Sequence, residues 1–247
     1  MSTIEELIKR KSIRSFSDKE ISEEDKKQIL LASINAPSAG NQEPYRIIDV
    51  TDKEIVKELS VLCDNQPFMN QAKMVLVYCI DFKKWYDIFK YHNAEPREMG
   101  QGDFVLSLID TTIAAQNAVT AAESLGIGSC YIGDILENKE KMCELLKLPE
   151  HVCPAVCIVF GYPNEAVING KKPKRESLDT IVCENTYKVL NEEDLNKLFK
   201  DKQNIEEDEK LDEWVNAFCK RKYNSDFSKE MQRSVSEYLK EYKMYND

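Results

Sequence analysis

The longest apolar stretch of the chain, residues 103 to 134, sets the first expectation about the fold. Only Asp110 and Glu123 carry a charge in its interior, and apolar or small residues occupy every face of a 3.6-residue period. This pattern is typical of a helix that is enclosed on all sides. We predict a helix about 33 Å long that is capped by Asp103 and ends at Gly126.

This helix is expected inside the protein and not across a membrane. Its two charges, together with Gln116 and Asn117, are unfavourable in a lipid bilayer. A buried core helix and a helix at a subunit interface both fit the pattern. The segment GIGSCYIGD that follows predicts a short strand and a glycine turn, where backbone amides can approach a ligand closely.

Hydrophobic periodicity and cap residues predict further elements along the chain. Ser2 or Thr3, followed three residues later by glutamate, indicates a capping-box helix start, and Ser22 starts a second helix that stops before Pro37. A turn-rich loop then leads into a strand within residues 36–50. The remaining predictions are helices at residues 52–62 and 137–150 and buried strands at residues 74–82 and 153–163.

Two segments have less regular patterns. Residues 82–102 look irregular and predict a mobile flap. In the tail, apolar residues at helical spacing predict two amphipathic helices, one around Trp214 and one around Tyr238. A charged link is expected between Lys200 and Lys210.

Composition narrows the function classes. A hydrophobic content of 42% and a charged content of 32% fit a soluble globular protein, and no secretory leader follows Met1, so a cytoplasmic location is the expectation. The net charge of −10 argues against a general nucleic-acid or anionic-membrane binder. The 8 cysteines form no CxxC pair and the chain has 2 histidines, so we predict buried reduced thiols and no metal site.

Two basic clusters stand out against this acidic background. Residues 9–14 hold Lys9, Arg10, Lys11 and Arg14, and residues 171–175 hold Lys171, Lys172, Lys174 and Arg175. Each cluster alone can be a solvated charge run. Two of them in one acidic chain indicate capture of a phosphate-bearing cofactor. The small and amide residues 38–42 can present donors and acceptors to a heteroaromatic ring, although an ordinary proline-bounded loop is the alternative.

In this order, the motifs RKSIRSF, APSAGNQEPY, SLGIGSCYIGD and FGYP followed by KKPKR resemble the nitroreductase-like FMN oxidoreductases. LCDNQPF, YCIDF, ENTYKVL and the helical tail are most similar to the branch of NADPH-dependent flavin reductases and oxygen-insensitive nitroreductases. The resemblance implies an α+β fold with a central mixed sheet flanked by helices. It also implies an intertwined homodimer with FMN at the subunit interface, a core at residues 1–190, and a helical extension at residues 191–247 that embraces the partner.

The resemblance also implies the residues that bind FMN. Arg10, Lys11 and Ser12 would hold the phosphate and ribityl chain, joined by Lys174, Arg175 and, in an alternative alignment, Lys172. Arg14 would reach the pyrimidine edge of the ring as an electrostatic stabiliser. The remaining residues implied are Pro37, Ser38, Ala39 and Asn41 from the partner subunit, Gln66 at the pyrimidine side, and Tyr131, Ile132, Gly133 and Asp134 near flavin N5.

The implied activity is ping-pong hydride transfer from NADPH, or NADH, through FMN to small acceptors such as nitroaromatics, quinones or free flavin. In the helical extension, Lys200 or Lys202 would meet the 2′-phosphate of NADPH, with a solvated charge run as the alternative. The flavin is expected to carry the chemistry, and no amino-acid side chain is expected to act as a catalytic group. The alternatives are a non-catalytic flavin sensor or carrier, another FMN chemistry such as dehalogenation or flavin destruction, and a protein that binds no flavin. Reduction of bound flavin by NAD(P)H would indicate the oxidoreductase and exclude the non-catalytic sensor or carrier.

Overall fold

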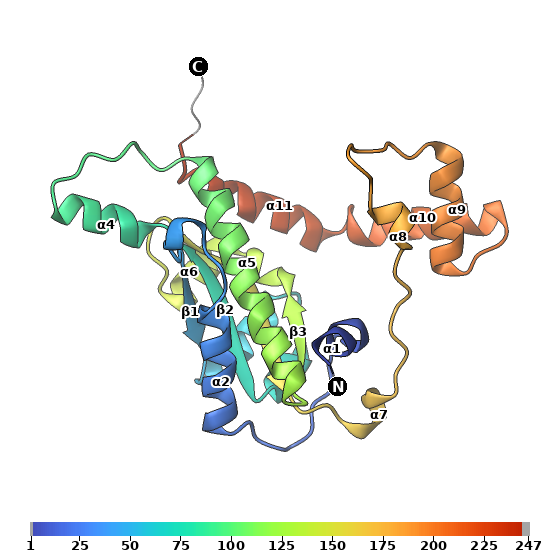
Figure 1. Cartoon of the computed structure of the whole chain (residues 1–247), viewed down its shortest axis with the longest axis horizontal. Coiled ribbons are helices and arrows are strands. Elements are labelled where there is room, and N and C mark those ends of the chain that lie inside the picture. The colour runs from blue at the N-terminus through green and yellow to red at the C-terminus, as the bar shows by residue number, and fades with distance from the viewer. Residues whose placement is uncertain (1, 244–247) are drawn as a thin grey trace. The chain divides into compact units, whose positions relative to one another are not determined.

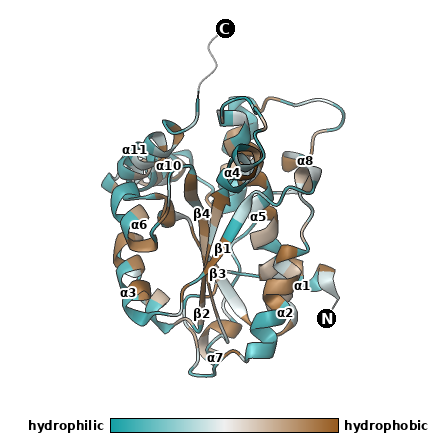
Figure 2. Cartoon of the chain, turned by 90° about the vertical axis from the view of Figure 1, so that its left-hand side faces the viewer, coloured by the Kyte–Doolittle hydropathy of each residue, from teal (hydrophilic) through white to brown (hydrophobic). Residues whose placement is uncertain are grey.

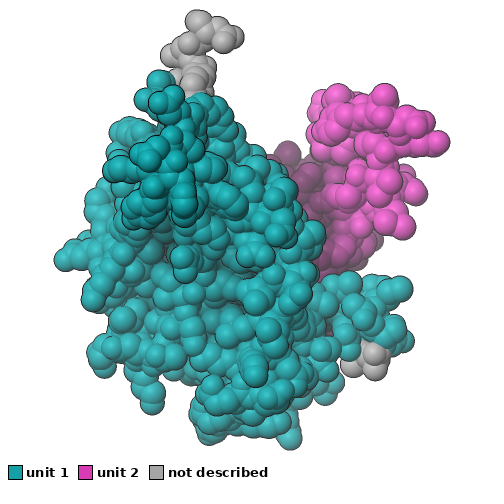
Figure 3. Space-filling model, turned by 60° about the vertical axis from the view of Figure 1, so that its left-hand side comes forward, with its two compact units in different colours: residues 1–170, 230–247 teal, residues 171–229 magenta. Residues whose placement is uncertain are grey.

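The computed structural model describes residues 2–243, and the chain divides into two compact units. One unit comprises the chain up to residue 170 together with the residues from 230 onward, and the other comprises residues 171–229; Figure 3 colours them separately. The expected division at residue 190 concerned a cofactor-binding core and a partner-embracing extension, and it stays a prediction.

The first unit is built on a four-stranded sheet in the order β1-β2-β4-β3. The strands are β1 (Tyr45–Asp49), β2 (Met74–Asp81), β3 (Gly128–Ile132) and β4 (Val152–Gly161), and each neighbouring pair is antiparallel. All residues of β2 are buried, as its continuous apolar sequence predicts for a strand covered on both faces. The α+β fold class is confirmed, and parallel pairing among the described residues is limited to isolated bridges such as Ser12–Ser129.

Helices cover both faces of the sheet, so that the first unit has three layers (Figures 1 and 2). On one face lie α3 (Lys53–Leu62), α6 (Lys139–Leu146) and the 3₁₀ turns η2 (Pro67–Gln71) and η3 (Gly133–Leu136). On the other face lie α2 (Glu23–Ile34) and α5 (Gln101–Ser124). The remaining short helices of this unit are α1 (Thr3–Lys9), α4 (Lys83–Tyr91), α7 (Glu165–Ile168) and the 3₁₀ turn η1 (Ala39–Asn41).

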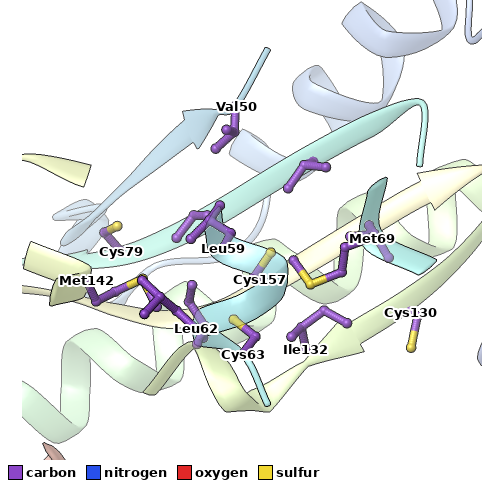
Figure 4. Packing of buried hydrophobic residues seen from close by; sticks show 14 of the residues in the cluster. Val50, Leu59, Leu62, Cys63, Met69, Cys79, Cys130, Ile132, Met142 and Cys157 are labelled. Atoms are coloured by element: carbon purple, nitrogen blue, oxygen red, sulfur yellow. The ribbon is translucent and has the colours of Figure 1, made fainter. Parts of the chain in front are cut away.

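The buried cluster beneath α3 and α6 is rich in sulfur (Figure 4). It contains Cys63, Cys79, Cys130 and Cys157 together with methionine and aliphatic side chains. Burial raises the pKa of each of these thiols, so the neutral form is favoured. The prediction of buried reduced thiols is confirmed for these four and for Cys153, whereas Cys183 and Cys219 are exposed.

Several helix boundaries follow from the cap residues recognised in the sequence. The Ser2 hydroxyl accepts a hydrogen bond from the Glu5 backbone, and the Glu5 side chain accepts one from the Ser2 backbone. Ser22 and Asp52 cap α2 and α3 in the same way. Gly126 follows α5 with φ of +73°, a left-handed conformation that ends the helix at little cost to glycine.

The long helix α5 begins three residues earlier than expected. Its N-cap is Gly100, and Asp103 lies in the first turn, where its carboxylate accepts hydrogen bonds from the Gly100 backbone and from Arg97. Burial alone would raise the pKa of Asp103, but these hydrogen bonds outweigh it and lower the pKa. Among the described residues α5 is the one helix long and apolar enough to cross a membrane. Its buried polar residues, Ser107 and Asp110 among them, nevertheless contact protein, as in a core helix.

The prediction of an irregular flap at residues 82–102 is wrong for its first half. Residues 83–91 form α4, and Phe82, Trp85, Tyr86 and Phe89 are spaced three or four residues apart. Their rings contact each other along one side of the helix, which stabilises it. Residues 93–99 remain without regular structure.

The prediction of two helices in the tail is also incomplete. Beyond α8 (Leu178–Ile181), the tail contains α9 (Glu192–Gln203), α10 (Asp208–Lys222) and α11 (Asp226–Leu239). The expected charged link overlaps the last turn of α9, so the connection to α10 is shorter than predicted. Asn191 caps α9 by accepting a hydrogen bond from the Asp194 backbone, a signal that was available in the sequence.

Candidate functional site

The N-terminal basic segment lies along the edge of the sheet next to β3. The Ile13 backbone donates to the Ser129 carbonyl at 2.9 Å, and the Ser17 backbone donates to the Tyr162 carbonyl at 2.8 Å. Ile13 is buried, whereas Ser12 and Arg14 on either side of it are exposed. The alternation of side chains in an extended segment therefore buries Ile13 and presents the polar residues to solvent.

Two glycines allow this close approach. A Cβ atom on Gly128 would lie 2.5 Å from Ile13, and one on Gly161 would lie 2.7 Å from the Phe16 ring. Real Cβ atoms do not approach this closely, so a larger residue would displace the basic segment. Gly128 and Gly161 belong to the SLGIGSCYIGD and FGYP motifs, which explains physically why these motifs occur together with RKSIRSF.

The basic side chains gather around the middle of β3. The Cys130 thiol is within hydrogen-bonding reach of Ser12 and Arg14; burial raises its pKa, and these two residues and Arg10 partly offset that effect. Burial also raises the pKa of Tyr131 to about 12, and the positive charge of Arg10 opposes this shift. Ser12 and Arg14 are thus brought to Cys130, and Arg10 to both Cys130 and Tyr131, more than a hundred residues away in sequence.

A second group of predicted residues lies just after β3. Gln66, which precedes η2, donates a hydrogen bond through its side-chain amide to the carboxylate of Asp134 in η3. Gly133 is exposed, and a Cβ atom there would meet nothing within 4 Å. Ile132 has its side chain in the core, so only its backbone is available to a ligand. This turn therefore offers an open stretch of backbone beside an ordered amide and carboxylate.

A third group, residues 37–43, is held against α5. The Ser38 hydroxyl donates to Asp110 at 2.7 Å, and the Ala39 backbone donates to the same carboxylate oxygen at 3.0 Å. The Glu43 backbone in turn donates to the Ser38 hydroxyl at 2.7 Å. The hydroxyl of Ser38 is therefore engaged within the chain. Pro37 and Asn41 are the exposed members of the predicted set in this loop.

Helix α4 supports the same loop from its other end. Trp85 donates its ring N–H to the Gln42 carbonyl at 2.8 Å, and Lys84 donates to the Glu43 carbonyl. Asn41 and Glu43 both have positive φ, a conformation that most residues disfavour. These supports therefore hold a strained loop in one shape. Sequence analysis missed Asp110, Lys84 and Trp85 because each acts across a long sequence separation.

The members of the predicted phosphate set have different surroundings. Lys11 donates to the carbonyls of Ile168 and Gly170 at 2.7 and 2.6 Å, and so fixes the chain just before the second basic cluster. In the second unit, Lys174 donates to the Asp201 carbonyl at 2.5 Å, Lys172 is half-buried and Arg175 is exposed. Lys200 and Lys202, the candidates for a 2′-phosphate, form ion pairs with Asp208 and Glu176.

Comparison with known proteins identifies the family. A model described as the nitroreductase family matches residues 7–162, which include all three groups described above for the first unit. The chain belongs to the nitroreductase family.

Individual members of the family are similar over most of their length. An FMN reductase (NADPH) from Bacillus subtilis is 32% identical over 92% of this chain and 96% of its own length. An oxygen-insensitive NADPH nitroreductase from Salmonella typhimurium is 35% identical over 77% of this chain and 76% of its own. The structure of the NfrA1 nitroreductase from B. subtilis, 31% identical, superposes with a TM-score of 0.81 and covers 97% of this chain and 98% of its own.

The described residues of this nitroreductase-family chain include cationic and hydrogen-bonding groups near β3 that can bind an anionic ligand. The described residues hold no group of three or more His, Cys, Asp or Glu side chains suited to a metal ion. The buried thiols have raised pKa values, which makes them poor nucleophiles. The chain presents guanidinium groups, a hydroxyl, an amide and exposed backbone, which are groups suited to binding and orienting a cofactor.

Proposed function

We propose that this protein is an FMN-dependent NAD(P)H oxidoreductase that acts as a nitroreductase or flavin reductase. The relatives named above support the activity class. The proposal is carried to this chain by the placement of Ser12 and Arg14 beside Cys130 of β3, and of Arg10 near Cys130 and Tyr131. The Gln66–Asp134 pair and the open Gly133 backbone lie at the end of the same strand.

The residues present are chemically suited to FMN. Arg10 and Ser12 offer a positive charge and a hydroxyl for the phosphate and ribityl chain. Lys11 donates two of its ammonium hydrogens to the Ile168 and Gly170 carbonyls, so its third would be available to the phosphate. Arg14 offers a cation for the pyrimidine edge of the ring. Gly133 leaves its backbone accessible near the expected position of N5. The contribution of Lys172, Lys174 and Arg175 stays a prediction from the sequence.

Bound FMN would supply the redox chemistry, taking a hydride from nicotinamide and passing it to an acceptor in a ping-pong cycle. The protein's part is to bind, orient and tune. The guanidinium of Arg14 would stabilise negative charge on a reduced ring by placing a cation next to it. The acceptors we propose are nitroaromatics, quinones or free flavin, since an open planar site selects mainly by stacking. NADPH is the preferred donor in this proposal.

We further propose a homodimer in which α5 faces the partner. One face of α5 is buried on the sheet, but Val105 and Ile109 on its other side remain 52% and 48% exposed. The short helix α1 also exposes Ile4, Leu7 and Ile8. Exposed apolar residues on neighbouring helices are typical of an interface between subunits. Partner residues from the 37–43 loop would then complete each site.

The test is an absorption spectrum of the purified protein with FMN, recorded before and after anaerobic addition of NADPH or NADH. Rapid bleaching of the flavin bands supports the oxidoreductase, and a faster rate with NADPH supports the donor preference. Flavin that binds but stays oxidised with both nucleotides favours a sensor or carrier. Absence of flavin binding refutes the proposal, and light scattering on the same sample reports whether the protein is a dimer.

A variant pair sharpens this test. Arg14→Gln removes the proposed stabilising cation, and Lys27→Gln removes one positive charge from the exposed side of α2. Because the reduced ring carries the charge that Arg14 stabilises, the flavin reduction potential is expected to fall in Arg14→Gln and to stay unchanged in Lys27→Gln. Equal potentials in both variants would remove Arg14 from this role.

A further inference from the structure

Glu137 is a buried carboxyl group that no motif of the sequence singled out. It directly follows the η3 turn, and its backbone N–H donates to the Asp134 carbonyl at 3.0 Å. The residue is only 4% exposed, and its side-chain Oε1 has no hydrogen-bond partner among the described residues. An ionised carboxylate normally accepts several hydrogen bonds, so this environment disfavours the charged form.

The groups that face Glu137 are mainly acidic. Asp134 comes from the same turn, Asp64 from the loop after α3, and Glu230 from α11, while the neutral Cys63 thiol lies nearby at the end of α3. Arg233 on α11 pairs with Glu230 at 2.8 Å, and the Asn138 backbone donates to Glu230 at 3.1 Å. Glu230 is thereby kept ionised, with a lowered pKa.

These surroundings bring the titration of Glu137 into the physiological range. Burial contributes most, followed by the negative charges of Asp134, Asp64 and Glu230, and together they raise the pKa of Glu137 to about 7. A hydrogen bond between the Glu137 and Asp134 side chains adds to this effect. Two carboxyl groups share a hydrogen bond only when one of them carries a proton, so protonation of Glu137 allows it to donate to Asp134.

The pair is connected to the candidate site through Gln66. Gln66 donates its amide N–H to the Asp134 carboxylate, which leaves its amide oxygen to accept a hydrogen bond from a ligand. We infer that Glu137 is a positioning residue whose proton holds the Asp134 carboxylate toward Gln66, and whose ionisation weakens flavin binding at this site. This inference rests on the proposed FMN function.

The physical reason is electrostatic and geometric. When Glu137 is neutral, it donates to Asp134, and Asp134 carries the single negative charge that orients Gln66. When Glu137 loses its proton, two adjacent carboxylates repel each other, and the hydrogen bond that fixes Asp134 is lost. A further negative charge then lies beside a site that binds an electron-rich ring. We expect flavin affinity to fall roughly fivefold to tenfold between pH 6 and pH 8.5. This is the order of magnitude of the repulsion from one partly screened negative charge beside the binding site.

The experiment measures riboflavin binding by fluorescence quenching between pH 5.5 and 8.5. Riboflavin is the probe because it lacks the phosphate, whose own ionisation near pH 6 would obscure the result. In parallel, infrared difference spectra of the protein without flavin follow the C=O band of a protonated carboxyl group over the same pH range. The unaltered protein should show the two transitions at the same midpoint, near pH 7.

Three variants are compared. Glu137→Gln should remove the infrared transition and keep the affinity nearly constant with pH, because the amide can still donate to Asp134. Glu140→Gln is the matched control, since Glu140 is exposed and its pair with Arg233 lowers its pKa to about 2, far below the tested range. Asp64→Asn removes one repelling charge and leaves Glu137 in place, so both midpoints should move to lower pH.

The outcomes separate this inference from the proposed function. An infrared transition that Glu137→Gln abolishes, with a riboflavin affinity that does not change with pH, overturns the positioning role. An infrared transition that persists in Glu137→Gln, or is absent from the unaltered protein, overturns the assignment of the proton. Failure of the unaltered protein to bind riboflavin and FMN at every pH overturns the proposed function, and the inference with it. If Glu137→Gln does not fold, unchanged midpoints in Asp64→Asn overturn the inference.

Discussion

Ser38 donates its hydroxyl hydrogen to the carboxylate of Asp110 at 2.7 Å, although the two residues are 72 positions apart in the chain. The bond joins the loop expected to face flavin to the middle of the central helix α5. Asp110 is 3% exposed, and the Ala39 backbone donates to the same oxygen. The conformation of the loop therefore depends on one buried charge in α5.

Removal of this charge is expected to destabilise the protein. Asp110→Ala leaves the Ser38 hydroxyl and the Ala39 amide without an acceptor, at a cost of about 1.5–3 kcal/mol in the free energy of unfolding. Ser38→Ala should cost less, because the Ala39 bond remains. In urea denaturation the double variant should lose less than the sum of the two single variants. Additive losses would contradict the coupling, and Ser124→Ala, in which an exposed hydroxyl of α5 is removed, is the control.

The glycines beneath the basic segment provide a second prediction. Gly161→Ala and Gly128→Ala place a methyl group against Phe16 and Ile13, and such overpacking costs about 1–3 kcal/mol. Flavin affinity should fall as well, because the segment carries Ser12 and Arg14. Gly102→Ala, which meets nothing within 4 Å in the first turn of α5, should be neutral or slightly stabilising. If the three variants had the same unfolding midpoint, this packing argument would be contradicted.

The buried carboxyl of Glu137 predicts an unusual dependence of stability on pH. Its pKa is about 7 in the folded protein and 4.5 in an ordinary carboxyl, so the folded state binds the proton more tightly than the unfolded state does. The stabilisation is fully present below about pH 4.5 and is lost as the pH rises through about 7. The melting temperature of the unaltered protein, relative to that of Glu137→Gln, should therefore decline between pH 5 and pH 8. A constant difference would mean that Glu137 does not titrate in this range.

The distribution of thiols predicts their reactivity. Cys183 and Cys219 are exposed, Cys143 is half-buried, and the others are buried with raised pKa values where a shift is resolved. A disulfide reagent at neutral pH should therefore modify 2 of the 8 cysteines rapidly in the native protein, and all of them after denaturation. Cys183→Ser and Cys219→Ser should each remove one rapidly reacting thiol. Fast modification of buried thiols in the native state would contradict the packing beneath α3 and α6.

Local patterns in the sequence determined most of the regular elements. The caps at Ser2, Ser22 and Asp52 and the left-handed Gly126 act within a few residues, so their effect can be recognised without the fold. The apolar run of β2 likewise predicts a buried strand. Two of the helices that were missed, α4 and α9, show the limit of this approach. In α4 the aromatic residues were interpreted by composition and not by their spacing, and α9 exposes most of its surface.

What only the tertiary structure decided is which distant residues meet. The sequence contains the basic segment, the glycines and the 37–43 loop, but it does not specify that Gly128 and Gly161 admit Ile13 and Phe16, or that Asp110 anchors Ser38. Nor does it distinguish Glu137 from the many solvated carboxylates of this acidic chain. Burial and the approach of acidic groups from three elements set the protonation of Glu137, and these depend on packing across the whole domain.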